Sequence, residues 1–157
     1  MRLKKVINKK VRNATIISYN GITFKSKMEL YCYQKLTELK IQFKYEEKTF
    51  ELMPSFQFEN DSYELFKKQG VRYFGPQRPH IRGISYTPDF VGNGWIIETK
   101  GNPNDVFPLK WKLFKKYLTD NKLNIDLYMP RNQGQIDDVI EIIKKKHEGI
   151  LQGKKSK

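Results

Sequence analysis

The sequence predicts an α/β fold in which a mixed central sheet is flanked by helices. Apolar residues recur at helical spacing in three separate segments, 26–40, 106–118 and 136–143. The chain between these segments contains short runs typical of strands, at 41–52, 95–97 and 125–129. The resulting order is helix, strands, helix, strand, and we expect a single domain over residues 1–157.

The N-terminal elements are marked by local signals. Asn20-Gly21 lies between β-favouring residues of the segment 15–24, which predicts a tight hairpin. Ser26 and Glu29 then form a capping box that opens a helix. The apolar stripe of this helix recurs up to about residue 40, at Met28, Cys32, Leu36 and Leu39.

The segment 41–52 alternates in a way that predicts one long strand or two short ones. Residues 53–84 are less regular, because Gly and Pro residues interrupt any long element. We treat 53–84 as a basic insertion, and we expect a basic arm at 1–13 and a frayed basic tail at 151–157.

The second half of the chain supplies the remaining elements. Trp95-Ile96-Ile97 predicts a buried strand. A helix over 106–118 should turn Val106, Leu109, Leu113, Phe114 and Tyr117 inward and leave Lys110 and Lys112 at its solvated edge. A strand over 125–129 should end at Pro130, and the last helix has an apolar stripe of Ile136, Val139, Ile140 and Ile143.

A carboxylate pattern at the centre of the chain points to metal chemistry. Pro88-Asp89 is followed by an apolar run that ends in Glu98-Thr99-Lys100. In an extended strand Glu98 and Lys100 share one face, while Thr99 points away and leaves its carbonyl at the edge. If Asp89 lies on the neighbouring strand, Asp89, Glu98 and the Thr99 carbonyl form an oxygen site suited to Mg²⁺, with Mn²⁺ as a substitute. Lys100 can then orient or deprotonate a water that attacks phosphorus.

A structural explanation of the same pattern stays open. The spacing between the aspartate and the glutamate is common by chance, and Glu98 with Lys100 could form an ion pair on a solvated face. The buried strand that precedes them favours the metal site, because such a strand rarely ends in Glu-Thr-Lys-Gly for packing reasons alone.

Charge and composition indicate the class of partner. The chain carries 30 Lys and Arg residues against 17 Asp and Glu residues, a formal net charge of +13 that favours a polyanion such as nucleic acid. The single cysteine, Cys32, excludes an intramolecular disulfide. No apolar run approaches the roughly 18 residues of a membrane span, so we expect a cytoplasmic protein.

Basic and aromatic residues alternate within the insertion. No acidic residue occurs between Glu64 and Asp89, where Phe66, Tyr73 and Phe74 are interleaved with the cations. This combination suits phosphate contact and stacking on exposed bases, although a solvated loop whose aromatic residues pack inward is the alternative. The predicted DNA-binding residues of this segment are Lys67, Lys68, Arg72, Arg78 and Arg82.

The motifs together resemble those of a known superfamily. Pro88-Asp89 with Glu98-Thr99-Lys100 resembles the PD-(D/E)xK nuclease site, and the order of elements resembles the αβββαβ core of restriction endonucleases. Ser26–Glu29, Phe43–Glu47, Tyr86–Phe90 and Ile97–Gly101 occur in the order seen in phage endonuclease I-type Holliday junction resolvases. Phe107–Phe114 is similar to a helix of other small phage nucleases, and the resemblance covers about residues 24–118.

The resemblance implies a role for each matching residue. Asp89 and Glu98 would bind the metal, Lys100 would act on the nucleophilic water, and Glu29 would help to hold the metal or its water. A capping-box glutamate needs no catalytic role, so a purely structural Glu29 stays open. Lys110 would match a basic position that contacts the phosphate of the cleaved strand, although a solvated helix face explains it nearly as well.

Two departures from the resolvase pattern concern substrate and assembly. About thirty residues separate Leu52 from Ser85, where the resolvases have a short connection, and the long N-terminal strand of their swapped dimers has no clear counterpart. A four-way junction nevertheless requires two cuts, which predicts a homodimer through the Asn20-Gly21 hairpin and the strand at Ile16-Ile17.

These observations predict a Mg²⁺-dependent endonuclease, of phage origin, that cleaves branched or junction DNA. The alternatives are a non-catalytic nucleic-acid-binding protein and a nicking or restriction-type nuclease without junction preference. A ribosomal-type RNA-binding protein fits the basic ends but not the order of carboxylates. A zinc site is disfavoured, because His80, His147 and Cys32 lack ligand spacing.

Overall fold

The computed structural model describes residues 16–101 and 106–148, so the predicted basic arm at 1–13 and basic tail at 151–157 lie outside the described residues. The described chain has mixed α/β content, with a mixed four-stranded sheet and three α-helices. It divides into two compact units. One unit contains residues 1–48 and 87–157, and the other contains residues 49–86.

The first unit begins with the hairpin and the helix that the sequence predicts. β1 (Ile17–Tyr19) pairs with β2 (Ile22–Phe24) across Asn20-Gly21, whose φ angles of 49° and 76° are those of a tight two-residue turn. α1 (Lys27–Glu38) follows, and Ser26 caps it by accepting a 3.1 Å hydrogen bond from the backbone N–H of Glu29. The capping box is therefore formed.

The central sheet has the strand order β12-β11-β10-β3. β10 (Phe90–Gly92) runs antiparallel to both β3 (Phe43–Tyr45) and β11 (Trp95–Ile97). β12 (Asp126–Tyr128) runs parallel to β11, and α2 (Phe107–Asp120) lies in the connection between them. This parallel crossover needs a long connection, which the helix supplies.

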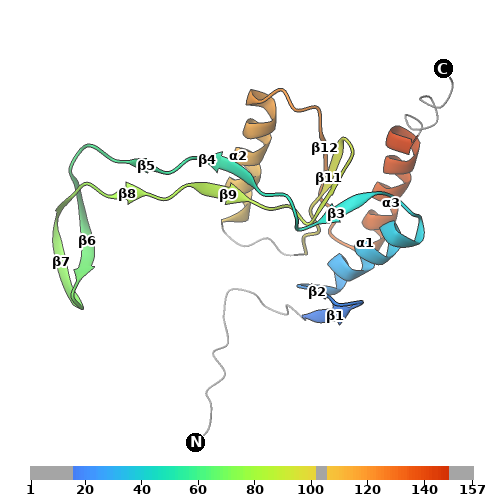
Figure 1. Cartoon of the computed structure of the whole chain (residues 1–157), viewed down its shortest axis with the longest axis horizontal. Helices are drawn as coiled ribbons and strands as arrows, with labels where there is room; N and C mark the ends of the chain where they lie inside the picture. Colours follow the sequence, from blue (N-terminus) through green and yellow to red (C-terminus); the bar gives the residue numbers. More distant parts are fainter. Residues whose placement is uncertain (1–15, 102–105, 149–157) are drawn as a thin grey trace, which may run out of the picture. The chain divides into compact units, whose positions relative to one another are not determined.

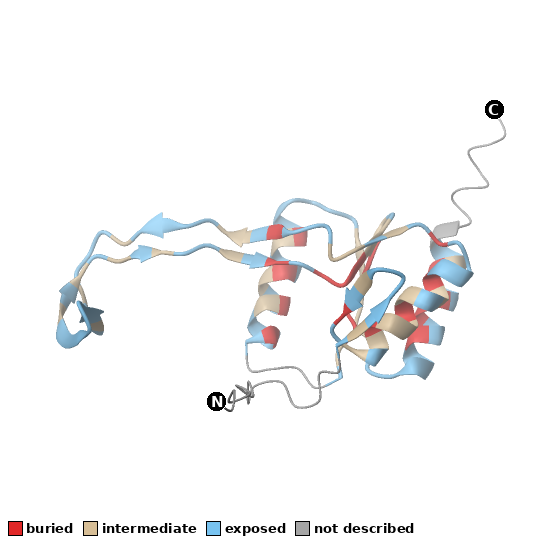
Figure 2. Ribbon diagram, turned by 60° about the horizontal axis from the view of Figure 1, so that its bottom comes forward, coloured by how far each residue is buried: buried red, intermediate tan, exposed pale blue. Residues whose placement is uncertain are grey.

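Helices cover both faces of this sheet. α1 and α3 (Gln133–Ile143) share a core cluster with β10 and β11, in which Phe90, Trp95 and Ile97 are buried. Figures 1 and 2 show α2 on the opposite side of the sheet. The apolar stripe predicted for the last helix is confirmed, because Ile136, Val139, Ile140 and Ile143 are all buried. Helix α3 continues into the π-helical turn η1 (Lys144–Glu148).

The inward face predicted for α2 is wrong in part. Its buried residues are Phe107, Trp111, Phe114 and Leu118, whereas Val106 and Leu109 are 57% and 58% exposed. The sequence is apolar in two overlapping helical registers here. The structure buries the register that contains the larger aromatic residues, which bury more apolar area.

The second unit is a long two-stranded ribbon (Figure 1). β4 (Phe50–Met53) pairs with β9 (Ile84–Tyr86), β5 (Phe56–Gln57) pairs with β8 (His80–Ile81), and β6 (Ser62–Lys68) pairs with β7 (Val71–Gln77). The alternation over 41–52 therefore produces two short strands, β3 and β4.

The expectation that 53–84 lacks long elements is wrong, because β6 and β7 each have seven residues. Gln69-Gly70, with φ angles of 51° and 83°, forms the two-residue turn between them. Gly75 and Pro76 are tolerated within β7, because a strand of a two-stranded ribbon has a free edge where a missing N–H costs little.

No helix in the described ranges, 16–101 and 106–148, has the length and apolar character needed to cross a membrane.

Candidate active site

Asp89 and Glu98 lie beside each other at the ends of adjacent strands. Phe90, the first residue of β10, pairs with Ile97, the last residue of β11, so the next residue outward on each strand is a carboxylate. Asp89 is 8% exposed and Glu98 is 3% exposed. The strand register thus brings together the two acids that the sequence spacing singles out.

Thr99 holds the Asp89 carboxylate in place. Its backbone N–H and its hydroxyl each donate a 2.7 Å hydrogen bond to Asp89 Oδ2. The sequence-based prediction that the Thr99 side chain points away from the acids is therefore wrong. β11 ends at Ile97, so the strict alternation of strand side chains does not extend to Thr99.

Glu29 enters the site from the first turn of α1. Its Oε1 accepts a 2.9 Å hydrogen bond from the Ser26 hydroxyl, and its Oε2 accepts from the Lys25 N–H at 3.0 Å and from the Tyr45 hydroxyl at 2.8 Å. The same carboxylate therefore caps the helix and faces the acids of the sheet. The capping role and a role in the site are compatible, because a carboxylate oxygen has more than one lone pair.

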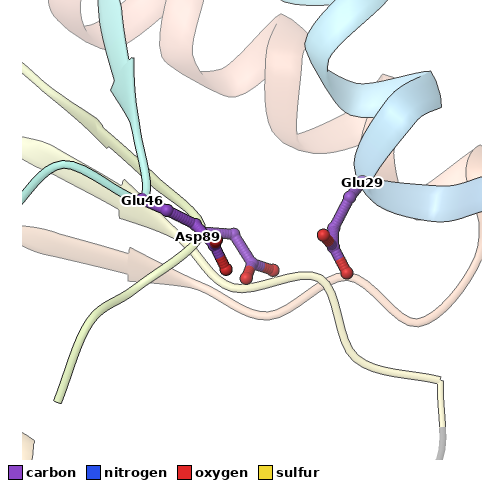
Figure 3. Close-up of side chains that lie close together, drawn as sticks. All are labelled: Glu29, Glu46 and Asp89. Carbon is purple, nitrogen blue, oxygen red and sulfur yellow. The ribbon is translucent and has the colours of Figure 1, made fainter. Parts of the chain in front are cut away.

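Glu46 completes a group of three carboxylates (Figure 3). One carboxylate oxygen each from Glu29, Glu46 and Asp89 lies within 4.8 Å of the other two. Glu46 follows β3 with a φ of 46°, an uncommon backbone conformation for a residue with a side chain. Its N–H donates a 2.9 Å hydrogen bond to the Asp89 carbonyl, and its carboxylate forms an ion pair with Lys25.

The electrostatics centre on Asp89. Burial, and then the nearby carboxylates of Glu98 and Glu29, raise the pKa of Asp89 to about 8, although the two hydrogen bonds from Thr99 oppose this rise. Asp89 is thus close to Glu98, which follows β11, and to Glu29 on α1. A divalent cation would relieve this accumulation of negative charge, so the donor set fits an oxygen-binding metal such as Mg²⁺.

Lys100 lies at the same end of the sheet. Its Nζ is 2.9 Å from Glu98 Oε1 and 4.4 Å from the centre of the Phe107 ring. Its backbone N–H donates to the Pro130 carbonyl at 3.0 Å, while the Glu98 N–H donates to the Tyr128 carbonyl at 2.9 Å. The predicted site residues Glu29, Asp89, Glu98, Thr99 and Lys100 therefore all lie in one region of the first unit.

The metal-ligand set differs in membership from the set predicted by spacing. Within the described residues, the group with metal-binding geometry contains Glu29 and Glu46 beside Asp89, and Glu98 is not part of it. Glu98 remains close enough to raise the pKa of Asp89. Glu46 was not predicted from the sequence, because a Glu-Glu pair after a strand has no characteristic spacing that indicates a metal site. Glu46 nevertheless lies in the Phe43–Glu47 motif.

The predicted DNA-binding residues lie outside this acidic group. Lys67 and Lys68 end β6, Arg72 lies in β7, and Arg82 lies between β8 and β9. Arg78 pairs with Asp61 at 2.8 Å, so part of its charge is neutralised within the ribbon. In α2, Lys112 is exposed and Lys110 is half-buried.

Comparison with known proteins gives a family and no activity. The chain has no match among curated proteins or among solved structures. The family model described as "Protein of unknown function (DUF1064)" matches residues 9–131, well over half of the 157 residues. The chain therefore belongs to the DUF1064 family of proteins of unknown function.

Proposed function

We propose that this protein is a metal-dependent DNA endonuclease of the PD-(D/E)xK type. The observation that carries the proposal is the position of Asp89, which is buried close to Glu98, just beyond the neighbouring strand, and to Glu29 on α1, with Lys100 beside Glu98. A purely structural cluster has little reason to bury several like charges, because each buried anion needs compensation.

The order and direction of the strands support the same proposal. α1, β3, β10, β11, α2 and β12 follow one another as in an αβββαβ core, with three antiparallel strands and a fourth parallel to the third. This order is compatible with a restriction-endonuclease-like fold into which the ribbon of residues 49–86 is inserted. In such a fold, Asp89 and Glu98 would be the carboxylates at the strand ends.

Asp89 and Glu29, with Glu46 or Glu98, would hold the cation, for which Mg²⁺ is the natural choice and Mn²⁺ a substitute. When bound, the metal supplies a Lewis acid for the phosphate and a more acidic water. Thr99 orients the Asp89 carboxylate, and Tyr45 orients that of Glu29. Lys100 provides a cation beside the carboxylates that can hold the water or the scissile phosphate.

DNA is the proposed polyanion. The chain carries a formal net charge of +13, which attracts the negatively charged phosphate backbone of DNA over a long range. Branched or junction DNA, cut by a homodimer with one site per protomer, remains the proposed substrate. A nicking or restriction-type nuclease without junction preference is the second candidate, because the ribbon of residues 49–86 replaces the short connection of the junction resolvases.

The test uses the full chain with linear, nicked, flap and four-way DNA in MgCl₂, in MnCl₂ and in excess EDTA. We expect cleavage with either metal and none in EDTA. Asp89→Asn and Glu98→Gln should each abolish cleavage while DNA binding in EDTA stays as tight or becomes tighter, since an anion near the phosphate has been removed. Binding without cleavage of any substrate would replace the nuclease with a non-catalytic DNA-binding protein.

A further inference from the structure

The outer hairpin of the ribbon, β6 with β7, has two chemically different faces. Directly opposed residues of an antiparallel pair lie on the same face, and successive pairs alternate between faces. One face therefore carries the pairs Tyr63/Pro76, Leu65/Phe74 and Lys67/Arg72. We call these six residues the apolar-basic face.

The apolar part of this face is open to solvent. Tyr63 is 64% exposed, Leu65 is 63% exposed and Phe74 is 73% exposed. These three side chains and Pro76 adjoin one another through the cross-strand register. A contiguous apolar patch of this kind usually marks a binding surface.

The charged end of the face points to the kind of partner. Lys67 lies directly opposite Arg72, and like charges in such a cross-strand pair destabilise a hairpin. None of the six residues is acidic, so nothing on the face itself relieves the repulsion. A bound anion would relieve it, which indicates a negatively charged partner.

The opposite face of the same hairpin is different. The Phe66 and Tyr73 rings lie 5.9 Å apart, and Tyr73 and Val71 are 48% and 53% exposed. This face also carries an acid, Glu64, whose carboxylate accepts a hydrogen bond from Ser62. Lys68, adjacent in sequence to Lys67, belongs to this second face, where it opposes Val71. The two neighbouring lysines of β6 therefore lie on different faces of the hairpin.

We propose that the apolar-basic face binds unpaired nucleotides of the DNA substrate, and this rests on the proposed DNA endonuclease function. Bases released from the duplex would stack on Phe74 and Tyr63, with Leu65 filling the space between them, while Lys67 and Arg72 contact the phosphates. Intact duplex DNA offers phosphates on its outside but keeps its base faces stacked, so it would leave the three apolar side chains without a partner. The face therefore selects substrates with a single-stranded segment, such as flaps, forks and opened junctions.

Charge argues against a second copy of this chain as the occupant. Two copies would each bring a net charge of +13, and the face carries cations without acids to pair across a symmetric interface. Pro76 also has no N–H with which to extend the sheet through that position of β7.

The binding test uses fluorescence anisotropy in EDTA, so that no DNA is cut. The probes are a labelled oligo(dT) single strand, a blunt duplex and a flap made from the same duplex. The variants are Leu65→Ser with Phe74→Ser on the apolar-basic face, Lys67→Gln on the same face, and Lys122→Gln, at an exposed lysine of the first unit, as the control. Circular dichroism of each variant checks that the fold is retained, which the exposure of the substituted side chains favours.

We expect the Leu65/Phe74 variant to lose roughly tenfold or more in affinity for the single strand and the flap, as removal of a stacking platform does, with duplex binding unchanged. Lys67→Gln should reduce the slope of log K against log salt for the single strand by about 0.7, and Lys122→Gln should leave it as in the wild type. Equal losses on duplex and single strand, or equal effects of Lys67→Gln and Lys122→Gln, would overturn the proposal.

Two further outcomes separate this inference from the proposed function. Wild-type protein that binds and cleaves DNA while all three variants behave like it would overturn the role of the face alone. Wild-type protein that binds none of the probes would contradict the DNA endonuclease as well. If light scattering instead shows a dimer that only the Leu65/Phe74 variant dissociates, the face is a contact between copies and the nucleotide proposal is wrong.

Discussion

Thr99 donates two hydrogen bonds of 2.7 Å to the same oxygen of Asp89, one from its backbone and one from its hydroxyl. Asp89 immediately precedes β10, and Thr99 is the second residue after β11. The two bonds therefore fix one carboxylate oxygen across the strand ends and leave the other available to a cation.

Substitution of Thr99 tests this relationship. Thr99→Val keeps the shape and removes the hydroxyl donor, so the ionised form of Asp89 loses stabilisation and its pKa should rise further. We expect a loss of about 1.5–3 kcal/mol of unfolding free energy at alkaline pH, the usual contribution of a hydrogen bond to a charged group. Thr99→Ser, which retains the donor, is the control in urea unfolding at pH 9, and equal stability of the two variants would contradict the role of the hydroxyl.

The raised pKa of Asp89 predicts how metal-free stability depends on pH. Between the ordinary value of 3.8 and about 8, the folded protein holds a proton on Asp89 that the unfolded chain releases. The free energy of unfolding should therefore fall as pH rises through this window, by up to about 1.4 kcal/mol per pH unit. Urea titrations in EDTA from pH 5 to pH 9 measure it, and Asp89→Asn should flatten the dependence.

Addition of saturating Mg²⁺ should cancel that trend, because the cation binds the deprotonated carboxylate and releases the proton from the folded protein. The stabilisation by Mg²⁺ should grow from pH 6 to pH 9. A Mg²⁺ effect that is equal at both ends of this range would count against Asp89 as a ligand.

Glu46 and Glu47 offer a comparison of adjacent glutamates. Glu46 belongs to the group of three carboxylates, whereas the Glu47 side chain is 60% exposed and pairs with Lys44 at 3.0 Å. Glu46→Gln should weaken Mg²⁺ binding, measured by calorimetry, by about 10-fold or more, in the range found for lost metal-site interactions. Glu47→Gln should bind Mg²⁺ like the wild type, and matching affinities of the two variants would remove Glu46 from the site.

Lys100 should affect rate more than metal affinity. A protonated lysine has no lone pair for a metal, so Lys100→Ala should leave Mg²⁺ affinity within a few-fold and lower the cleavage rate by about 10²–10⁴. Single-turnover cleavage at saturating Mg²⁺ measures the rate. Lys115→Ala, which removes a lysine of α2 distant in sequence from the motif, is the control. A large loss of Mg²⁺ affinity without a loss of saturated rate would assign Lys100 a purely structural role.

Gly92 tests the packing at the end of β10 farther from Asp89. A Cβ at Gly92 would lie 2.0 Å from Cε2 of the Trp95 ring, the residue opposite it in the sheet. Gly92→Ala should therefore destabilise the protein by about 1–3 kcal/mol, as expected for overpacking a buried ring. Gly75→Ala in β7, where a Cβ meets nothing within 4 Å, should be near neutral in the same thermal unfolding measurement.

Short-range signals predicted several elements of the first unit. The Asn20-Gly21 turn, the Ser26 cap and the apolar stripe of α3 depend on local chemistry that the sequence displays directly. The same local signals did not predict which face of α2 is buried, nor the regular hairpin within 53–84. Both required a choice between competing patterns that only tertiary packing or strand pairing decides.

The candidate site also contains residues that the sequence predicts and residues that only the tertiary structure reveals. Asp89 and Glu98 could be paired from spacing, because a strand register of one hairpin connects them. Glu46 could not, since its place depends on a left-handed backbone turn and on a hydrogen bond to Asp89 across 43 positions of sequence. The Thr99 side chain was misplaced because the strand ends one residue before Glu98.

The bond between the Glu46 N–H and the Asp89 carbonyl also clamps the two points where the chain leaves and re-enters the first unit. Residues 49–86 therefore form an insertion whose two ends are held together by this hydrogen bond. Lengthening an insertion of this kind costs little conformational entropy. The carboxylates Glu29, Glu46, Asp89 and Glu98 all belong to the first unit, so such an insertion can be shortened or exchanged without changing them. Under the proposed nuclease function, substrate preference and hydrolytic chemistry can then evolve on separate stretches of one chain, and exchange of the ribbon between relatives is a way to alter that preference.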